Sequence, residues 1–179
     1  MPEAETREAR FNRLYELHLE AVRTYAWRRA PGLADDIVAE TFLVAWRRLE
    51  DVPADDALPW LIGVARNVRA NIRRGDRRRE ALVERLGGEP AEPHDVPLVA
   101  ERDELRAALA SLSETDREVL LLTVWEDLDR GRVAQALGCS RANVAVRLFR
   151  ARRRLESALA AGEHGSPAHI SGGAFDARS

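Results

Sequence analysis

Two clusters of arginine carry the strongest chemical signal in this chain of 179 residues. The first cluster lies between Arg66 and Arg79, with Asp76 as its only acidic residue, and the second lies between Arg141 and Arg154, with none. The formal net charge is only −2, so the positive charge is segregated within a mildly acidic chain. Two separated basic helices suit two contacts on one long polyanion.

Composition limits the class of protein. The 28 basic residues are all arginine. A bias toward GC-rich codons accounts for this by itself, although the planar guanidinium also suits phosphate and guanine recognition. A single cysteine excludes an internal disulfide and a paired-cysteine metal site. No segment approaches the ~20 apolar residues of a membrane span, and no signal peptide begins the chain. We therefore expect a cytoplasmic protein without metal or other cofactors.

The pattern predicts an all-α protein in which two small helical domains are joined by a flexible linker. Alanine, leucine, arginine and glutamate dominate the composition and favour helix. Glycine, proline and acidic residues interrupt the periodicity in the middle of the chain, as is typical of a linker. The expected divisions are a first domain over 8–79, an acidic linker over 80–100, a second domain over 101–161 and a disordered tail over 162–179.

Capping chemistry predicts where several helices begin. Asp35 or Asp36 is expected to cap a second helix that runs to about Arg48. Pro59 suits the first turn of a third helix. In the second half, Ser113 resembles the first residue of a capping box.

Residues 130–150 fit a helix-turn-helix. Ala134 is small where two helices would cross, and Gly138 falls four residues later, where the turn needs a left-handed residue. The outer arc of the following helix would enter the major groove, where Arg and Asn read guanine and adenine edges. The alternative is a solvated basic helix that closes a helical hairpin. The predicted duplex contacts here are Ser140, Arg141, Ala142, Asn143, Val146, Arg147 and Arg150.

The third helix has a different polar face. Trp60, Asn67, Asn71 and Arg74 fall on one line of a helical wheel. An aromatic ring, two amides and a guanidinium in a row suit unpaired bases, and stacking contributes ~1–3 kcal/mol per base. Alternatively, Trp60 belongs to the core and the amides are ordinary solvated residues. A further arc could follow phosphates and consists of Arg66, Arg69 and Arg73.

The second helix has an outward stripe that suits a protein partner. Asp36, Glu40, Leu43 and Arg47 recur at i, i+4, i+7 and i+11. A leucine among charged residues on an exposed face favours docking, although a single exposed leucine is also normal on a protein surface.

Taken in order, these motifs resemble bacterial RNA polymerase sigma factors of the extracytoplasmic-function (ECF) subgroup. The small size, without a domain for region 3, points to that subgroup. The resemblance covers roughly residues 11–78 and 103–158. The segments that carry it are 35–47 for regions 2.1–2.2, 59–67 for regions 2.3–2.4, and 112–122, 133–140 and 147–152 for region 4.

The resemblance implies a subunit that binds core RNA polymerase and directs promoter-specific transcription initiation. The second-helix stripe would dock on the β′ clamp helices. The third helix would read the −10 element as single strand, with Asn67 and Asn71 on bases, Trp60 supporting melting, and Arg73 and Arg74 on the backbone. The second domain would read the −35 element as duplex and touch the β flap. The resemblance also implies that the free protein is a monomer and that an anti-sigma factor holds it inactive.

The chain departs from the family pattern where the helix-turn-helix begins. Asp127-Leu-Asp129 stands where the family has Gly-Leu-Ser or Gly-Leu-Thr, although Asp129 can still act as a cap. Arg130-Gly-Arg132 replaces acidic residues, so we expect this helix to start late or fray, because glycine costs ~1 kcal/mol in a helix interior. Arg132 would gain a phosphate contact.

Two other functions are compatible with parts of the sequence. A helix-turn-helix repressor or activator would dimerise on a palindrome and would not bind core polymerase. An enzyme is the third class, but the chain has no HExxH motif, phosphate-binding glycine loop or nucleophile elbow. We therefore expect a protein that is not an enzyme.

Overall fold

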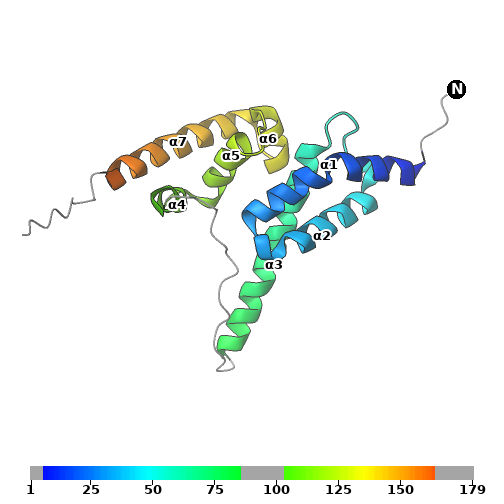
Figure 1. The fold of residues 1–179 in the computed structure, drawn as a ribbon, viewed down its shortest axis with the longest axis horizontal. Coiled ribbons are helices and arrows are strands. Elements are labelled where there is room, and N and C mark those ends of the chain that lie inside the picture. Colours follow the sequence, from blue (N-terminus) through cyan, green and yellow to red (C-terminus); the bar gives the residue numbers. More distant parts are fainter. Residues whose placement is uncertain (1–5, 86–102, 164–179) are drawn as a thin grey trace, which may run out of the picture.

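The structure, a computed structural model, describes residues 6–85 and 103–163. These residues form α-helices and short 3-10 turns, and no strand occurs among them (Figure 1). The all-α prediction is confirmed. The first domain contains α1 (Arg7–Arg29), η1 (Pro31–Leu33), α2 (Ala34–Arg47), η2 (Leu49–Asp51) and α3 (Leu58–Arg85), and the second contains α4 (Asp103–Ala110), α5 (Glu114–Val124), α6 (Arg130–Leu137) and α7 (Arg141–Glu163).

In the first domain, α1, α2 and the first half of α3 pack against one another. Val22, Ile37 and Leu61 meet in this core and are fully buried. The second half of α3 extends beyond α1 and α2 as a single rod (Figure 1). The last arginines of the basic cluster, Arg77, Arg78 and Arg79, are exposed on this second half.

In the second domain, α7 packs against α4, α5 and α6. Val119, Leu122 and Val144 are fully buried between these helices. Gly138 has φ of 62°, and its N–H donates to the carbonyl groups that end α6. The left-handed turn predicted at this glycine is confirmed, and it places α7 as the second helix of a helix-turn-helix.

Two predicted helix starts are wrong. Neither Asp35 nor Asp36 caps α2, because η1 leads directly into the helix at Ala34; both carboxylates lie in the first turn, where they complement the helix dipole. The late start expected for α6 is also wrong. This helix begins at Arg130, because the Asp129 carboxylate accepts the N–H groups of Gly131 at 2.6 Å and Arg132 at 3.0 Å.

Other boundaries differ by a few residues or lie outside the described part of the chain. Helix α3 continues to Arg85, past residue 80, where we expected the linker to begin. Helix α4 begins at Asp103, and α7 reaches Glu163. The rest of the predicted linker and almost all of the predicted tail lie outside the described residues. None of the described helices is long and apolar enough to cross a membrane.

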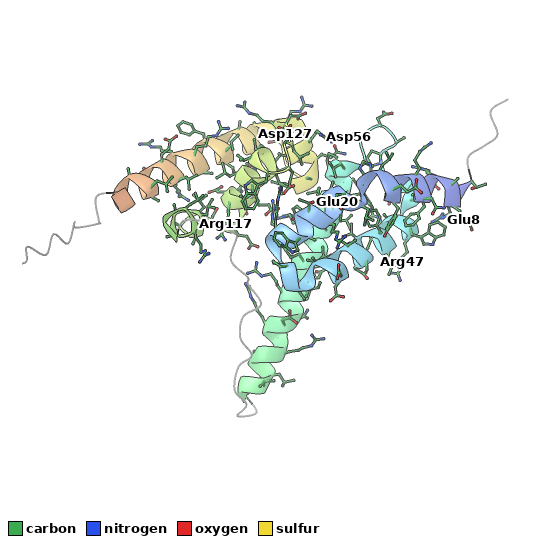
Figure 2. The ribbon with its side chains drawn as sticks, in the orientation of Figure 1. Glu8, Glu20, Arg47, Asp56, Arg117 and Asp127 are labelled. Atoms are coloured by element: carbon green, nitrogen blue, oxygen red, sulfur yellow. The ribbon has the colours of Figure 1, made fainter. Side chains whose placement is uncertain are left out.

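The two domains pack against each other through α1 and α3 on one side and α5 and α6 on the other. Asp56, labelled in Figure 2, lies in the loop before α3 and accepts two hydrogen bonds from Arg132 of α6. Gly63 of α3 lies against the backbone of Ala136. The arrangement therefore places part of the helix-turn-helix directly on the first domain.

Candidate nucleic-acid interface

The outer face of α3 presents amide and guanidinium groups to solvent. Asn67, Asn71 and Arg74 are exposed, as the helical wheel predicts. The Arg74 guanidinium donates to the Asn71 Oδ1 atom, so these two side chains are held together. Trp60 lies at the start of the same line but is only partly exposed, packs against the core and has the Arg48 guanidinium 5.8 Å from its ring.

A second arc of α3 faces acidic residues rather than solvent. Arg69 is largely buried, and its Nη2 atom lies 3.7 Å from Glu114 and 3.9 Å from Glu118. Arg73 lies 3.4 Å from Glu114. Because both acids belong to α5, these arginines connect the domains. Arg66, the third member of the predicted phosphate arc, is half-buried.

The start of α7 has the local structure that a groove-reading helix requires. Ser140 caps it by accepting the N–H of Asn143 at 3.2 Å. Arg141, Ala142 and Asn143 follow the cap and are exposed. These short or polar side chains leave the N-terminal end of α7 accessible, and this end is the part that contacts base edges in helix-turn-helix proteins.

One predicted contact on α7 is tied into its own domain. The Arg147 Nε atom donates to the Asn143 Oδ1 atom at 2.6 Å, and its Nη1 atom donates to Asp116 at 3.3 Å. Asp116 is buried on α5 and also lies 3.6 Å from Arg154. This carboxylate pairs with two arginines of α7 and, together with Asn143, holds the Arg147 side chain in place.

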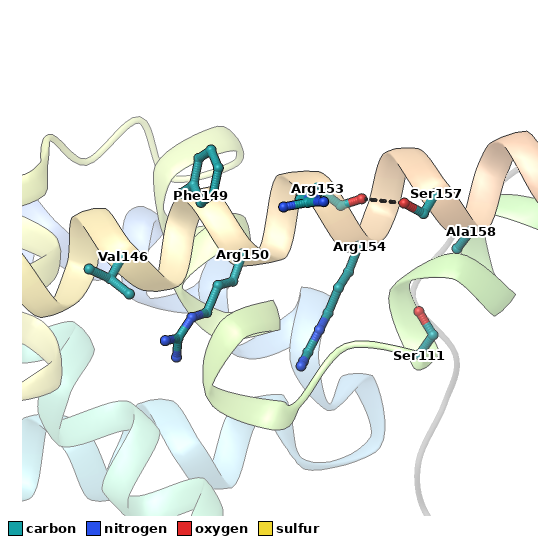
Figure 3. Close-up of a pocket in the computed structure, with 8 residues that line it drawn as sticks. All are labelled: Ser111, Val146, Phe149, Arg150, Arg153, Arg154, Ser157 and Ala158. Atoms are coloured by element: carbon teal, nitrogen blue, oxygen red, sulfur yellow. Dashed lines mark hydrogen bonds between the residues drawn. The ribbon is translucent and has the colours of Figure 1, made fainter.

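An open groove of about 840 Å³ runs beside the middle of α7, with Ser111 at the end of α4 on its other side. Val146 and Arg150, two predicted duplex contacts, line it together with Phe149. Figure 3 shows Arg150 and Arg154 extending from one side of α7 and Phe149 from the other. The side chain of Phe149 is 66% exposed, an unusual exposure for an aromatic residue.

The predicted stripe on α2 is exposed over its whole length. Asp36, Glu40, Leu43 and Arg47 all point away from the core, while Ile37 on the opposite face is fully buried. The helix is thus amphipathic in the way the sequence predicts, and its outer face is available to a protein partner.

Several residues at the domain interface were not predicted from the sequence. Glu118 and Arg29 are buried and paired at 3.2 Å, and the Tyr25 hydroxyl donates to Glu118 at 2.9 Å. Burial is the main cause that raises the pKa of Tyr25, followed by the Glu118 charge. The sequence offered one sign of this interface, because Glu118 adjoins the apolar run of α5. A carboxylate in such an apolar environment is uncommon unless it is paired.

Comparison with known proteins agrees with this geometry. Residues 14–79 match the family model of sigma-70 region 2, and residues 102–155 match that of sigma-70 region 4. The RNA polymerase sigma factor NccH of Alcaligenes xylosoxydans is 35% identical over 70% of this chain and 72% of its own length. The ECF sigma factor SigL of Mycobacterium tuberculosis is 33% identical over 82% and 86%.

The chain belongs to the ECF family of RNA polymerase sigma factors. A solved structure of the relative CnrH, known from Cupriavidus metallidurans, in complex with the cytosolic domain of CnrY, has a TM-score of 0.59 at 26% identity and covers 87% of this chain and 90% of that one. Sigma factors are non-enzymatic transcription initiation factors that direct polymerase to promoters. In this ECF sigma factor, α1–α3 therefore correspond to region 2 and α4–α7 to region 4.

Proposed function

We propose that this sigma factor contacts core polymerase and the two promoter elements through three separate helical faces. The observation that carries the proposal is the exposed line of Asn67, Asn71 and Arg74 on α3, beside an arc of the same helix in which Arg69 and Arg73 pair with acids of α5. Exposed amides beside a guanidinium can bond the edges of unpaired bases, whereas duplex DNA hides those edges. These residues would read the melted −10 strand, with Arg66 and Arg73 near its phosphates and Trp60 supporting melting.

The −35 duplex would be read by α7. Its capped N-terminal end presents Arg141 and Asn143, the side-chain types that bond guanine and adenine in the major groove. Val146 and Arg150 continue along the same helix. In this proposal Ser140, Ala142, Arg132 and Arg147 position the helix through phosphate or apolar contacts.

Core polymerase would bind the outer face of α2. Leu43 supplies an apolar anchor that is flanked by Glu40 and Arg47, and all three are exposed. An apolar side chain ringed by charged residues is the usual composition of a small binding hot spot. The partner surfaces on the polymerase, the β′ clamp helices and the β flap, follow from membership of the family.

An anti-sigma factor would control this activity, and the free protein would be a cytoplasmic monomer. The support is the relative CnrH, which was solved with a bound partner domain and matches both regions of this chain. If the proposal is right, the protein isolated from unstressed cells is bound to a non-polymerase partner. Isolation only in complex with polymerase would contradict it.

The −10 assignment is tested with Arg74→Glu. In holoenzyme, this variant should lose promoter opening, measured by permanganate reactivity of thymines, while retaining core binding, measured by gel filtration. Arg77→Glu places the same charge change three residues further along the exposed part of α3 and is the control. Equal loss of opening and of core binding in Arg74→Glu would refute the assignment.

A further inference from the structure

A chain of hydrogen bonds within region 4 organises the polar end of α7. The Arg147 Nε atom donates to the Asn143 Oδ1 atom at 2.6 Å, and its Nη1 atom donates to the Asp116 Oδ1 atom at 3.3 Å. Asn143 and Arg147 are four residues apart on α7, a spacing at which side chains of one helix face meet. One guanidinium group therefore joins an exposed amide of the recognition helix to a carboxylate of α5.

Asp116 is a well-held anchor for this chain of bonds. The residue is buried, and its backbone N–H donates to the Ser113 hydroxyl group that caps α5, at 3.2 Å. Its second carboxylate oxygen, Oδ2, lies 3.6 Å from the Arg154 Nη1 atom. Because the backbone and both oxygens are engaged, the carboxylate has little freedom to turn. It therefore holds the Arg147 guanidinium on the side of α7 that faces α5.

The chemistry of arginine decides the direction of the Asn143 amide. A guanidinium group has N–H donors and no acceptor, so the amide atom beside the Arg147 Nε atom must be the oxygen. The amide nitrogen, Nδ2, is then turned away from Arg147. Because Asn143 is exposed, the two N–H donors of Nδ2 are left for a partner outside the protein. The Ser140 cap also holds the backbone here, by accepting the Asn143 N–H at 3.2 Å.

The positive charge of Arg147 also affects which atoms can approach the amide. The Oδ1 atom keeps a second lone pair, but this lone pair lies beside the guanidinium group. A further N–H donor brought to Oδ1 would meet that positive charge and be repelled, whereas an acceptor brought to Nδ2 would be attracted by it. The side chains of Asn143 and Arg147 together therefore present a face that favours acceptors over donors.

The bases of duplex DNA differ in how well they match such a face. An asparagine with both ends of its amide free bonds adenine, because it accepts from the N6 amino group and donates to N7. Guanine presents two acceptors in the major groove, N7 and O6, whereas cytosine presents an amino donor. A face that favours acceptors therefore matches guanine fully, matches adenine through N7 alone, and conflicts with cytosine.

We propose that Asn143 reads guanine in preference to adenine in the −35 duplex, and that Arg147 is the positioning residue that sets this preference. Asp116 acts one step further back, because it lies on α5 and holds the guanidinium that holds the amide. The side-chain type alone would assign Asn143 to adenine, so the bond from Arg147 changes the base that the residue selects. This inference rests on the proposed −35 role of α7.

The test is a selection of duplex DNA by holoenzyme. The full-length protein with core polymerase selects from duplexes that carry random base pairs across the −35 region upstream of its gene, and sequencing gives the base preference at each position. Asn143→Ala should remove the preference at one position, and wild type should prefer guanine there. Arg147→Met frees the amide to turn, so it should shift the ratio of guanine to adenine at that position by about tenfold toward adenine, the scale of one base contact.

The ratio of bases distinguishes positioning from a merely structural or electrostatic role. Loss of a phosphate contact or of stability in Arg147→Met would weaken binding to all sequences alike and leave the ratio unchanged. Arg152→Met is the matched control, because it removes the same charge from an exposed position of α7 and should keep the wild-type ratio at every position. An unchanged ratio in folded Arg147→Met, or the same shift in Arg152→Met, would overturn the inference.

A second variant keeps the test decisive if Arg147→Met folds poorly. In Asn143→Asp, an exposed change of nearly the same shape, Arg147 would hold one oxygen and the other would replace Nδ2. The preference at the same position should then move from guanine to cytosine, whose amino group is a donor. An adenine preference in wild type, or no gain of cytosine in Asn143→Asp, would overturn the inference.

The same selection separates this inference from the proposed function. If wild-type holoenzyme selects a −35 sequence in which no base preference depends on Asn143, the proposed function stands and this inference is wrong. If wild-type holoenzyme forms but selects no base pair in that region, the proposed −35 role of α7 is wrong, and the inference fails with it.

Discussion

Helices α3 and α7 are both rich in arginine, yet the structure uses their charges differently. On α3, Arg69 and Arg73 pair with Glu114 and Glu118 of the other region. On α7, by contrast, Arg147 and Arg154 pair with a buried acid of the same region, Asp116. Most of the remaining arginines on the two helices are exposed, although Arg66 of α3 is half-buried. Position relative to acids, and not local arginine density, decides which cations are free for DNA.

This difference separates pairs that stabilise one region from pairs that join the two regions. Pairs within region 4 help to hold α7 on α5 and should therefore contribute to the free energy of unfolding of that region. Pairs between the regions should instead contribute to the packing of region 4 against region 2. Substitutions that remove one acid at a time distinguish these roles.

The largest effect is expected from Asp116→Asn. The change leaves Arg147 and Arg154 without their buried anion, and because both guanidinium groups are partly exposed, we expect a loss of about 1–2 kcal/mol in the free energy of unfolding. Urea denaturation followed by circular dichroism measures it. Glu114→Gln is the matched control, because its exposed carboxylate pairs with Arg69 and Arg73 across the interface, and it should cost less than about 0.5 kcal/mol. Equal losses would remove the distinction between the two helices.

The next largest effect is on binding to the −35 duplex, and it distinguishes two arginines of α7. Arg150→Ala removes an exposed guanidinium and should weaken holoenzyme binding to the −35 duplex by about 1–2 kcal/mol with no loss of stability. Arg147→Ala should reduce both quantities, because Arg147 bonds Asn143 and Asp116. Titration of a fluorescent duplex measures the affinity of each variant for DNA, and thermal unfolding measures its stability. A purely structural role for Arg150 would appear as a change in melting temperature without a change in affinity.

A smaller effect is expected on binding to core polymerase, which involves protein contacts instead of DNA contacts. Leu43→Ala on α2 should weaken binding to core polymerase by about 1 kcal/mol, the scale of a modest interface anchor. Leu82→Ala, a similarly exposed leucine on α3, is the control and should bind normally. Competition for core polymerase with a labelled sigma factor would measure both. Similar weakening in the two variants would argue against the α2 face.

The smallest effect concerns the turn before α6. Asp127 has φ of 50°, a left-handed conformation that disfavours side chains with a Cβ atom, and glycine is the residue the family usually places there. Asp127→Gly should therefore raise the free energy of unfolding by about 0.5–1 kcal/mol. A lower melting temperature in the variant would mean that the Asp127 side chain makes a compensating interaction.

Much of this architecture was predictable because local signals were strong. The left-handed Gly138, the Ser113 and Ser140 caps and the exposed α2 stripe each depend on one helix or turn and its own residues. The domain interface was not predictable in this way. Tyr25, Arg29 and Glu118 lie far apart in the sequence, and nothing local distinguishes Arg29 from an arginine that simply ends a helix.

The same limit applies within the candidate site. A helical wheel places Arg69 and Arg73 on one face, but it cannot reveal that α5 of the other region covers that face. Arg132 is the clearest case, since its position before the recognition helix favours a phosphate contact while Asp56 binds it in the structure. The frayed start predicted for α6 was wrong for a local reason instead, because the Asp129 cap outweighed the unfavourable glycine.

Run-off transcription tests most directly whether this protein is a sigma factor that reads the −10 strand with α3. It uses core polymerase freed of other sigma factors, on DNA from upstream of the gene for this protein. We expect a discrete transcript that depends on this protein. It should disappear with Asn67→Ala plus Asn71→Ala and survive Asn12→Ala, which changes an exposed amide on α1. Gel filtration of the same samples measures binding to core polymerase. If the protein binds core polymerase but yields no transcript, the template is unsuitable and the proposed function still stands. The contradictory result is a protein that neither yields a transcript nor binds core polymerase.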